Sequence, residues 1–290
     1  MDLITVFERF PTQESCIAHL EKARWGDEPL CPHCGNNHVA RKRENERIGR
    51  WNCHSCKSSF NVLSKTIFQK TKIPLQKWFL GIAILLNAKK SVSSHQLGRH
   101  LNLNQPSAWR MGMQIRKAMV DDSVFLSGIV EADETFVATA GSRRKDDDDD
   151  PPKRGRGTKK QPVIGAMARG GKVVAQPSDK VTGKTLKAFL QSVVDADNSV
   201  LITDEFTGYS RMGEWVPHIT INHAVAYVDG LIFTNSIEGF WSLVKRAIFG
   251  SHHHYSREHA AAYIIESCFK YNSRNNPDVF DDFLQGTVTV

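Results

Sequence analysis

Four of the six cysteines form two close pairs, and their spacing constrains the fold more than any other feature of the chain. Cys31 and Cys34 make one Cys-x-x-Cys turn, Cys53 and Cys56 make the second, and 18 residues separate the pairs. Two such turns offer four thiolates in a tetrahedron, which suits one structural Zn²⁺ and leaves no open position for chemistry. The spacing therefore predicts a zinc ribbon within residues 1–70.

A pair of redox dithiols or disulfides is the alternative interpretation of these cysteines. We find no secretory signal, and Cys16 and Cys268 fall outside the pattern, so zinc is the better interpretation. The longest apolar run, Trp78 to Leu86, is too short to cross a bilayer. We expect a soluble, cytoplasmic protein.

Charge is distributed unevenly along the chain. The net charge is +7, yet residues 1–120 carry 19 Lys and Arg against 8 Asp and Glu, while the remainder carries 19 against 23. A basic front joined to an acidic rear indicates a part that binds polyanions and a part that does chemistry. We expect nucleic acid as the partner and association with the nucleoid. A basic surface that binds nothing specific remains the alternative.

Two helices joined by a tight turn are predicted within residues 71–122. The first spans Ser93 to Leu101, and the second begins near Pro106, whose missing amide hydrogen is harmless in a first helical turn. The second helix has an apolar stripe of Ala108, Met111, Ile115 and Met119. Its other face is polar, with Ser107, Arg110, Gln114 and Lys117. This pattern predicts a helix-turn-helix that offers donors to a DNA major groove, or else an ordinary helical hairpin with a solvated face.

From residue 123 the chain changes to short β-rich runs with interleaved helices, which predicts a mixed α/β sheet with layered packing. The expected strands are Gly128–Ala138, Val163–Ala168, Lys172–Ala175, Ser199–Thr203 and His218–Asn222, with a helix over Lys184–Val194. We expect a mobile loop at residues 141–161, because like-charge blocks such as Asp146 to Asp150 cannot bury apolar area.

Three acids lie in three different local settings of this rear part. Asp133 lies in the first predicted strand, Asp204 ends a later strand, and Glu238 opens an amphipathic helix. Carboxylates on neighbouring strands and on a helix can converge on one point, as two divalent cations require in phosphoryl transfer. Lys245 shares a helix flank with Glu238 and suits a DNA phosphate. The set predicts a nuclease or a polynucleotidyl transferase.

Each acid also has a purely structural interpretation. Glu131 and Glu134 can be charges at a sheet edge, and Asp204 can be a turn residue. Glu238 can complete a capping box with an N-terminal Asn235. An apolar stripe predicts that this helix packs on a core: Ile237, Phe240, Trp241, Val244 and Ile248.

Three segments resemble those of DDE transposases of bacterial insertion sequences, in the branch where a zinc ribbon precedes an RNase H-like catalytic domain. The segments are Val130–Phe136, Leu201–Asp204 and Thr234–Arg246. The resemblance also includes Pro162–Ala166, His223 and Tyr271–Arg274. It covers most of the chain and implies an RNase H-like mixed sheet over residues 123–290.

The resemblance implies that Asp133, Asp204 and Glu238 bind two Mg²⁺ ions, for which Mn²⁺ can substitute, and that Lys245 lies beside DNA. We expect Arg246, the next residue, to bind DNA as well. It implies an enzyme that binds element ends, cleaves a phosphodiester and joins the 3′-hydroxyl to target DNA, as a homo-oligomer on double-stranded DNA. Some relatives use Asn as the third ligand, so Asn235 stays open as a neighbour. Two rival functions remain: a DNA-binding regulator that has lost its chemistry, and an RNase H-like nuclease or resolvase without strand joining.

Overall fold

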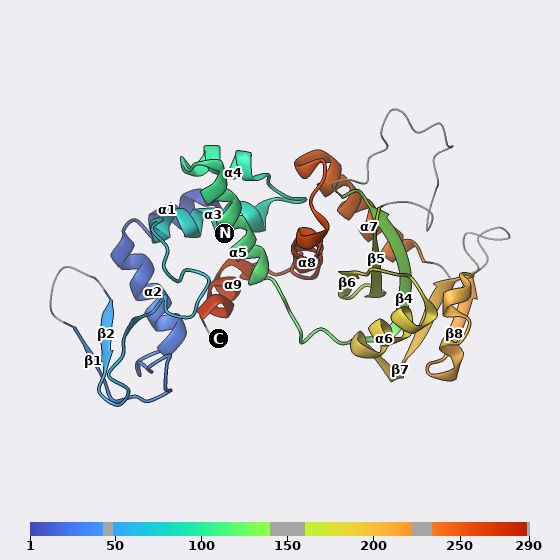
Figure 1. The fold of residues 1–290 in the computed structure, drawn as a ribbon, viewed down its shortest axis with the longest axis horizontal. Helices are drawn as coiled ribbons and strands as arrows, with labels where there is room; N and C mark the ends of the chain where they lie inside the picture. The colour runs from blue at the N-terminus through green and yellow to red at the C-terminus, as the bar shows by residue number, and fades with distance from the viewer. Residues whose placement is uncertain (43–48, 140–159, 222–233, 289–290) are drawn as a thin grey trace. The chain divides into compact units, whose positions relative to one another are not determined.

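The computed structural model describes residues 1–42, 49–139, 160–221 and 234–288 and divides into two compact units (Figure 1). The first unit holds Met1–Met119 together with Asn276–Val290, and the second holds Val120–Asn275. Among the described residues, no helix combines the length and the apolar character that a membrane span needs.

A three-stranded antiparallel sheet forms the ribbon of the first unit. Its strands are β1 (Val39–Arg41), β2 (Arg50–Cys53) and β3 (Ser59–Asn61), with β2 in the middle. The helices α1 (Leu3–Arg9) and α2 (Gln13–Trp25) precede it. Trp25, at the end of α2, packs edge-on against Trp51 and Phe60, so this helix is fastened to the ribbon.

Three helices follow the ribbon in the first unit. They are α3 (Leu75–Asn87), α4 (Ser94–Leu101) and α5 (Gln105–Lys117). Asn102 adopts the left-handed conformation between α4 and α5, with φ 49°. At Gly98 a Cβ would approach the Leu103 carbonyl oxygen to 2.8 Å, so the glycine permits the tight turn. Both predicted helices and the buried stripe of the second are confirmed, since Ala108, Met111, Ile115 and Met119 are all buried.

The C-terminal helix α9 (Val279–Val288) also belongs to the first unit. Phe280 lies against the rings of Phe10 and Phe79, and Leu284 is fully buried. The predicted 123–290 domain therefore ends too late. The apolar face of α9 packs against helices of the first unit, so this helix belongs to that unit. The division of residues 1–122 into two domains stays a prediction.

A five-stranded mixed sheet forms the centre of the second unit, in the order β6-β5-β4-β7-β8. Its strands are β4 (Leu126–Val137), β5 (Gln161–Ala168), β6 (Val173–Pro177), β7 (Val194–Asp204) and β8 (His218–Ile221). The first three pair antiparallel, β7 runs parallel to β4, and β8 runs parallel to β7. This order and these directions are those of an RNase H-like sheet, so the predicted fold class is confirmed. Residues 141–159 of the predicted mobile loop lie outside the described residues, and Gln161 already belongs to β5.

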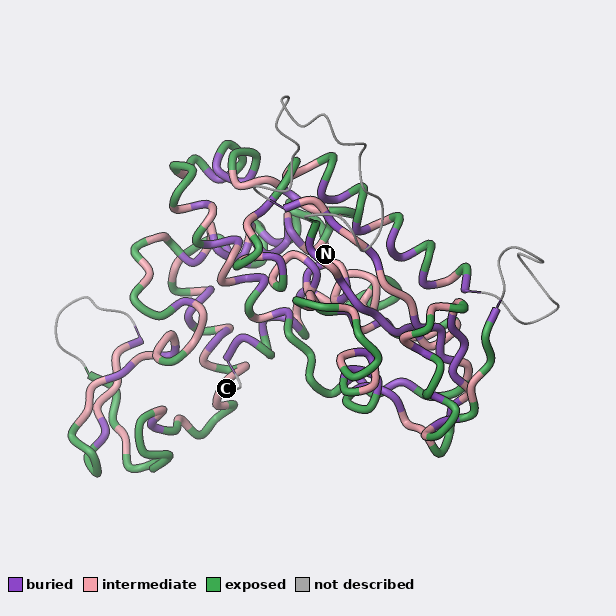
Figure 2. The backbone as a smooth tube through the Cα atoms, turned by 45° about the vertical axis from the view of Figure 1, so that its right-hand side comes forward, coloured by how far each residue is buried: buried purple, intermediate pink, exposed green. Residues whose placement is uncertain are grey.

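Helices cover both faces of this sheet. They are α6 (Gly183–Val193), α7 (Asn235–Ala247) and α8 (Ala260–Asn272), with single turns at η2 (Thr207–Tyr209), η3 (Met212–Glu214), η4 (Ile248–His252) and η5 (Arg257–His259). Phe189 of α6 shares a buried cluster with Val130, whereas Trp241 of α7 shares another with Val137. Because side chains alternate along a strand, these two clusters place the even-numbered residues of β4 toward α6 and the odd-numbered ones toward α7. Along the helices, buried and exposed residues alternate in Figure 2, as amphipathic packing requires.

The segment Tyr271–Arg274, which belongs to the family resemblance, fastens the edge of the sheet. The side chain of Asn272 accepts from the Val173 amide at 2.8 Å and donates to the Val173 carbonyl at 2.9 Å. The guanidinium of Arg274 lies over the Tyr271 ring. The two hydrogen bonds of Asn272 hold α8 on β6.

Candidate functional site

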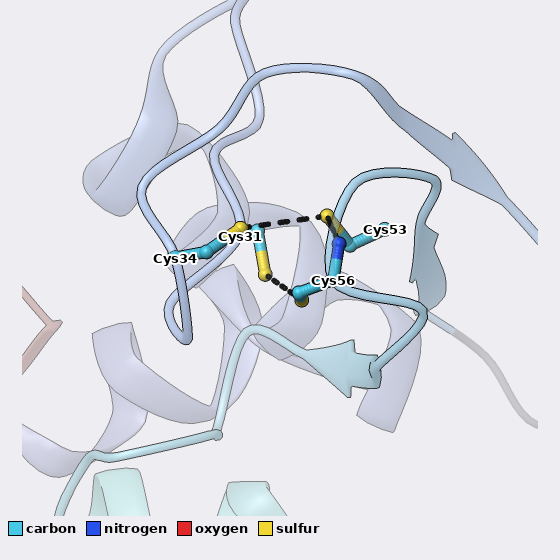
Figure 3. Close-up of side chains that lie close together, drawn as sticks. All are labelled: Cys31, Cys34, Cys53 and Cys56. Carbon is cyan, nitrogen blue, oxygen red and sulfur yellow. Dashed lines mark hydrogen bonds between the residues drawn. The ribbon is translucent and has the colours of Figure 1, made fainter.

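The four predicted cysteine ligands meet at one point of the ribbon, with their side chains directed toward one another (Figure 3). Their sulfur atoms all lie within 4.8 Å, with 3.7 Å from Cys31 to Cys56 and 3.6 Å from Cys34 to Cys53. A tetrahedral Zn²⁺ bound at about 2.3 Å would hold its sulfurs roughly 3.8 Å apart. The predicted ribbon is confirmed, and its cysteine cluster fits one structural Zn²⁺.

Hydrogen bonds prepare the second cysteine turn for a metal. The side chain of Ser58, and after it the Ser58 backbone, lowers the pKa of Cys56 to about 6. The Cys56 amide donates to Cys53 Sγ at 3.4 Å. Since Zn²⁺ binds thiolates rather than thiols, a lowered pKa at this turn favours the ligand form at neutral pH.

Asp133 and Asp204 lie on the same face of the large sheet. In the parallel pairing of β4 and β7, Glu131 lies opposite Ile202. Asp133 and Asp204 each lie two residues further along their strands. Because side chains alternate along a strand, both aspartates face the side that α7 covers. The Phe206 amide donates to Asp204 Oδ1 at 3.1 Å, which holds this carboxylate where the strand ends.

Negative charge is concentrated around Asp133. Burial, joined by the charges of Glu134 and Asp204, raises the pKa of Asp133 to about 7. Burial and the same three carboxylates raise the pKa of Tyr209, whose hydroxyl donates to Glu134 at 3.1 Å. A cation bound here would relieve the repulsion that raises the pKa of Asp133.

The indole of Trp241 orients Asp133. Its Nε1–H donates to Asp133 Oδ2 at 3.0 Å. The ring lies against Gly165, the residue of β5 opposite Asp133, where a Cβ would come within 2.6 Å of the indole. The glycine therefore makes room for a side chain that fixes the aspartate. Sequence reasoning missed this contact, although the resemblance included both segments.

Glu131 holds the first turn of α7 in place. Its carboxylate is fully buried and accepts from the backbone amides of Ser236 at 2.9 Å and Ile237 at 3.1 Å. The Ser236 hydroxyl and the Arg169 guanidinium also donate to it, at 3.0 and 2.9 Å. A carboxylate suits this position because the first amides of a helix lack intrahelical partners and carry partial positive charge. The interpretation of Glu131 as a sheet-edge charge is wrong.

The alternative capping box of Asn235 and Glu238 does not form. Thr234 is the N-cap and Asn235 the first helical residue, while the Thr234 hydroxyl donates to Glu238 Oε1 at 3.1 Å. Glu131 instead accepts hydrogen bonds from the amides of Ser236 and Ile237 in the first turn of the helix. The structure thus removes the capping interpretation of Glu238.

Residues of β4, of one flank of α7 and of η4 line a hollow of about 440 Å³. The lining residues are Asp133, Glu134, Thr135, Glu238, Trp241, Ser242, Lys245, Arg246 and Phe249. Glu238 and Lys245 therefore share one helix flank, as the sequence predicts. Asp204 is not among the described residues that line this hollow. Residues 222–233, which include His223, lie outside the described part of the chain.

The three carboxylates are not gathered to a common coordinating distance. Within the described residues, only the four cysteines form a group of three or more metal-ligating side chains within 4.8 Å of one another. The chemistry of the acidic set nevertheless suits Mg²⁺, because carboxylate oxygens are its preferred protein ligands. Burial first, and then the charges of Glu134 and Asp204, raise the pKa of Asp133, and a cation bound beside this carboxylate would oppose that shift.

The polar face of α5 lines a separate hollow within the first unit. Its volume is about 620 Å³, and Ser107, Arg110, Gln114 and Lys117 all lie along it. The prediction that these four residues share one helix face is confirmed. Their contact with DNA stays a prediction.

Comparison with known proteins connects both units to mobile elements. A model of the ISXO2-like transposase domain matches residues 125–272, and a transposase zinc-ribbon domain matches residues 11–59. The chain is 25% identical over 249 residues to the "Uncharacterized protein in transposable element ISH50" of Halobacterium salinarum, covering 82% of this chain and 83% of that protein.

Two solved assemblies of another transposase are also similar. The pre-cleavage Mos1 transpososome matches at 12% identity with a TM-score of 0.25, covering 72% of this chain and 78% of that one. The Mos1 mariner paired end complex with Mn matches at 15% identity with a TM-score of 0.26, covering 71% and 78%. Scores this low carry no argument about the site.

Proposed function

This chain belongs to the family of ISXO2-like transposases, and on that premise we propose that it catalyses the transposition of a DNA element. It binds the ends of the element, cleaves a phosphodiester with the help of two Mg²⁺ ions and joins the freed 3′-hydroxyl to target DNA. One observation carries the proposal: Asp133 and Asp204 face the same side of adjacent parallel strands, beneath the helix that bears Glu238.

Asp133, Asp204 and Glu238 would hold the two cations, and Mn²⁺ would substitute for Mg²⁺. Bound divalent ions supply an activated water and stabilise the attacking and leaving oxygens of an in-line displacement. Trp241 keeps Asp133 oriented through its hydrogen bond. Glu131 keeps the first turn of α7, and with it Glu238, over the sheet.

Lys245 and Arg246 are proposed to hold the DNA beside the carboxylates. Both are exposed and line the same hollow as Asp133 and Glu238. Cationic side chains bind phosphate oxygens through charge-assisted hydrogen bonds, and the planar guanidinium can do so with two bonds at once. The scissile strand would therefore lie along this flank of α7.

The first unit is proposed to recognise double-stranded DNA through Ser107, Arg110, Gln114 and Lys117 of α5. A recognition helix of this kind places its polar face in a major groove. An element has two ends to bring together, so we expect a homo-oligomer assembled on DNA. This activity places the protein on the genomic DNA that carries the element.

A strand-transfer assay tests the proposed function. The full-length protein is given a pre-cleaved element end, taken from the DNA that flanks its coding region, together with Mg²⁺ and target DNA. We expect joined product, which Asp133→Asn does not form. Cleavage without joining would indicate a nuclease or resolvase, and binding without either reaction would indicate a regulator.

A further inference from the structure

The segment of residues 66–73, which lies between β3 and α3, forms a wall opposite the polar face of α5. The hollow of about 620 Å³ lies between them, and this wall contributes Thr66, Ile67, Gln69, Lys70, Thr71, Lys72 and Ile73. All of these residues belong to the first unit. The polar face of α5 is therefore one side of a two-sided surface.

This wall is built from consecutive turns that internal contacts hold in place. The Gln69 amide donates to the Thr66 carbonyl at 3.0 Å, and the Thr71 amide donates to the Phe68 carbonyl at 3.1 Å. Lys70 lies between them in the left-handed conformation, with φ 58°. A segment closed by successive turns presents its side chains from a defined backbone.

An aromatic anchor fixes the wall to α3. Phe68 is fully buried and packs edge-on against Trp78, with 5.2 Å between the ring centroids. The indole Nε1–H of Trp78 in turn donates to Thr71 Oγ1 at 2.9 Å. Lys70 and Lys72, the exposed lysines on either side of Thr71, therefore project from a segment that these contacts hold in place.

The charge of the hollow comes from both sides and has one sign. Lys70 and Lys72 project from the wall, Arg110 and Lys117 project from α5, and all four are exposed. Among the described residues that line the hollow there is no carboxylate. Glutamine, serine and threonine side chains add further hydrogen-bond donors. This is the chemistry that recognises a chain of phosphates.

We propose that residues 66–73 are a second DNA-binding wall, which contacts the phosphates of one strand while α5 reads bases in the adjacent major groove. The proposal rests on the proposed function, because it takes the DNA of the element as the partner. Lys70 and Lys72 are assigned to phosphates because an ammonium on a flexible stem acts as a point charge. Phosphate contacts fix the register of a protein on a duplex without reading sequence.

The test measures how full-length, zinc-loaded protein binds two fluorescent duplexes, one with an element end and one unrelated, over a range of salt concentrations. We expect Lys70→Gln/Lys72→Gln to weaken binding to both duplexes by the same factor, roughly tenfold, because phosphates are common to both. The slope of log K against log salt should fall by about 1.8, since each phosphate contact contributes about 0.9.

Two matched variants make this result specific. Lys22→Gln/Lys89→Gln removes the same charge from exposed positions that do not line the hollow, and it should change neither affinity nor salt slope. Lys70→Arg/Lys72→Arg keeps the charge and should retain the salt slope of the natural protein. A fall in affinity that the arginine variant fails to restore would overturn the phosphate assignment.

The outcomes separate this inference from the proposed function. If Lys70→Gln/Lys72→Gln binds as the natural protein does while Arg110→Ala/Lys117→Ala binds weakly, the second wall is overturned and recognition by α5 stands. If both variants bind normally, DNA recognition by this unit fails as a whole. A loss confined to the element-end duplex would also overturn the inference, because it would indicate base reading.

Discussion

The zinc ribbon and the acidic site differ in how completely the backbone assembles them. The cysteines come from two turns, one that precedes β1 and one at the end of β2, and their sulfurs already lie at tetrahedral spacing, 3.6 and 3.7 Å across two pairs. The acids come from β4, β7 and α7 and are not gathered around a common point. A structural metal holds its fold together, so folding and binding are one event. A reaction centre must leave coordination positions open for water and phosphate, and its like charges repel.

Removing zinc should have the largest effect, since structural zinc contributes an apparent ~10–16 kcal/mol at neutral pH. We expect Cys53→Ser, or a chelator, to unfold β1, β2 and β3 while the large sheet of the second unit stays folded. Hydrogen exchange measured by mass spectrometry checks this strand by strand. Withholding Mg²⁺ is the matched treatment and should leave exchange in both units unchanged. If the amides of β2 stayed protected from exchange without zinc, the ribbon would not depend on the metal and the contrast with the acidic site would be wrong.

Breaking the ion pair beneath α7 should cost about 3–5 kcal/mol of stability, because a fully buried carboxylate is replaced by a neutral amide. In Glu131→Gln the partly buried Arg169 guanidinium loses this carboxylate, and a single carbonyl oxygen remains to accept the bonds from Arg169 and from the first amides of α7. Denaturant unfolding of the full-length protein measures the loss. The control is Glu214→Gln, which breaks an exposed pair with Arg211 and should cost about 0–1 kcal/mol. Equal losses in the two variants would remove the anchoring role of Glu131.

Filling the space beneath Trp241 should cost about 1–3 kcal/mol, the usual penalty for overpacking a core. In Gly165→Ala the new Cβ would lie 2.6 Å from the indole, so the ring must shift away from Asp133. Thermal unfolding gives the stability, and the Mg²⁺ concentration needed for cleavage should rise with it. Gly213→Ala is the control, because nothing lies within 4 Å of the added atom. If Gly165→Ala needed no more Mg²⁺ for cleavage than the natural protein, Trp241 would have no role in positioning the acidic site.

The smallest predicted effect is a pH dependence of stabilisation by Mg²⁺. The pKa of Asp133 is about 7 in the folded chain against an ordinary 3.8. The folded chain therefore holds a proton that the unfolded chain releases, and the stability due to this group is lost as pH rises through that window. Below pH 7 the proton competes with a cation, so Mg²⁺ should raise the melting temperature more at pH 8 than at pH 6. An equal shift at both pH values, or the same difference in Asp133→Asn, would contradict this.

Features set by neighbours in the sequence could be predicted. The Cys-x-x-Cys turns, the period-two alternation around Asp133 and the apolar stripe that includes Trp241 each depend on spacing within one element. Each is formed in the structure as expected. The flank shared by Glu238 and Lys245 follows from helical periodicity in the same way.

Features set by contacts between distant residues could not be predicted. Glu131 reaches Ser236 across 105 positions of the chain, and local spacing does not report such a bond. The fit of Trp241 against Gly165 depends on the register of β4 and β5 and on how α7 crosses them. The wall at residues 66–73 was also missed, because irregular turns that carry Lys70 in a left-handed conformation have no periodic pattern.

The most direct test of the central claim is the effect of Asp204→Asn on Mg²⁺-dependent cleavage of an element end. Asp204 is the decisive residue because it lies on the same sheet face as Asp133 and yet outside the hollow that α7 lines. If the three acids act as one reaction centre, cleavage and joining should fall by roughly 10³-fold or more, while DNA binding and zinc content remain those of the natural protein. Cleavage at the rate of the natural protein would contradict the account, because the acidic site would then work without its second strand.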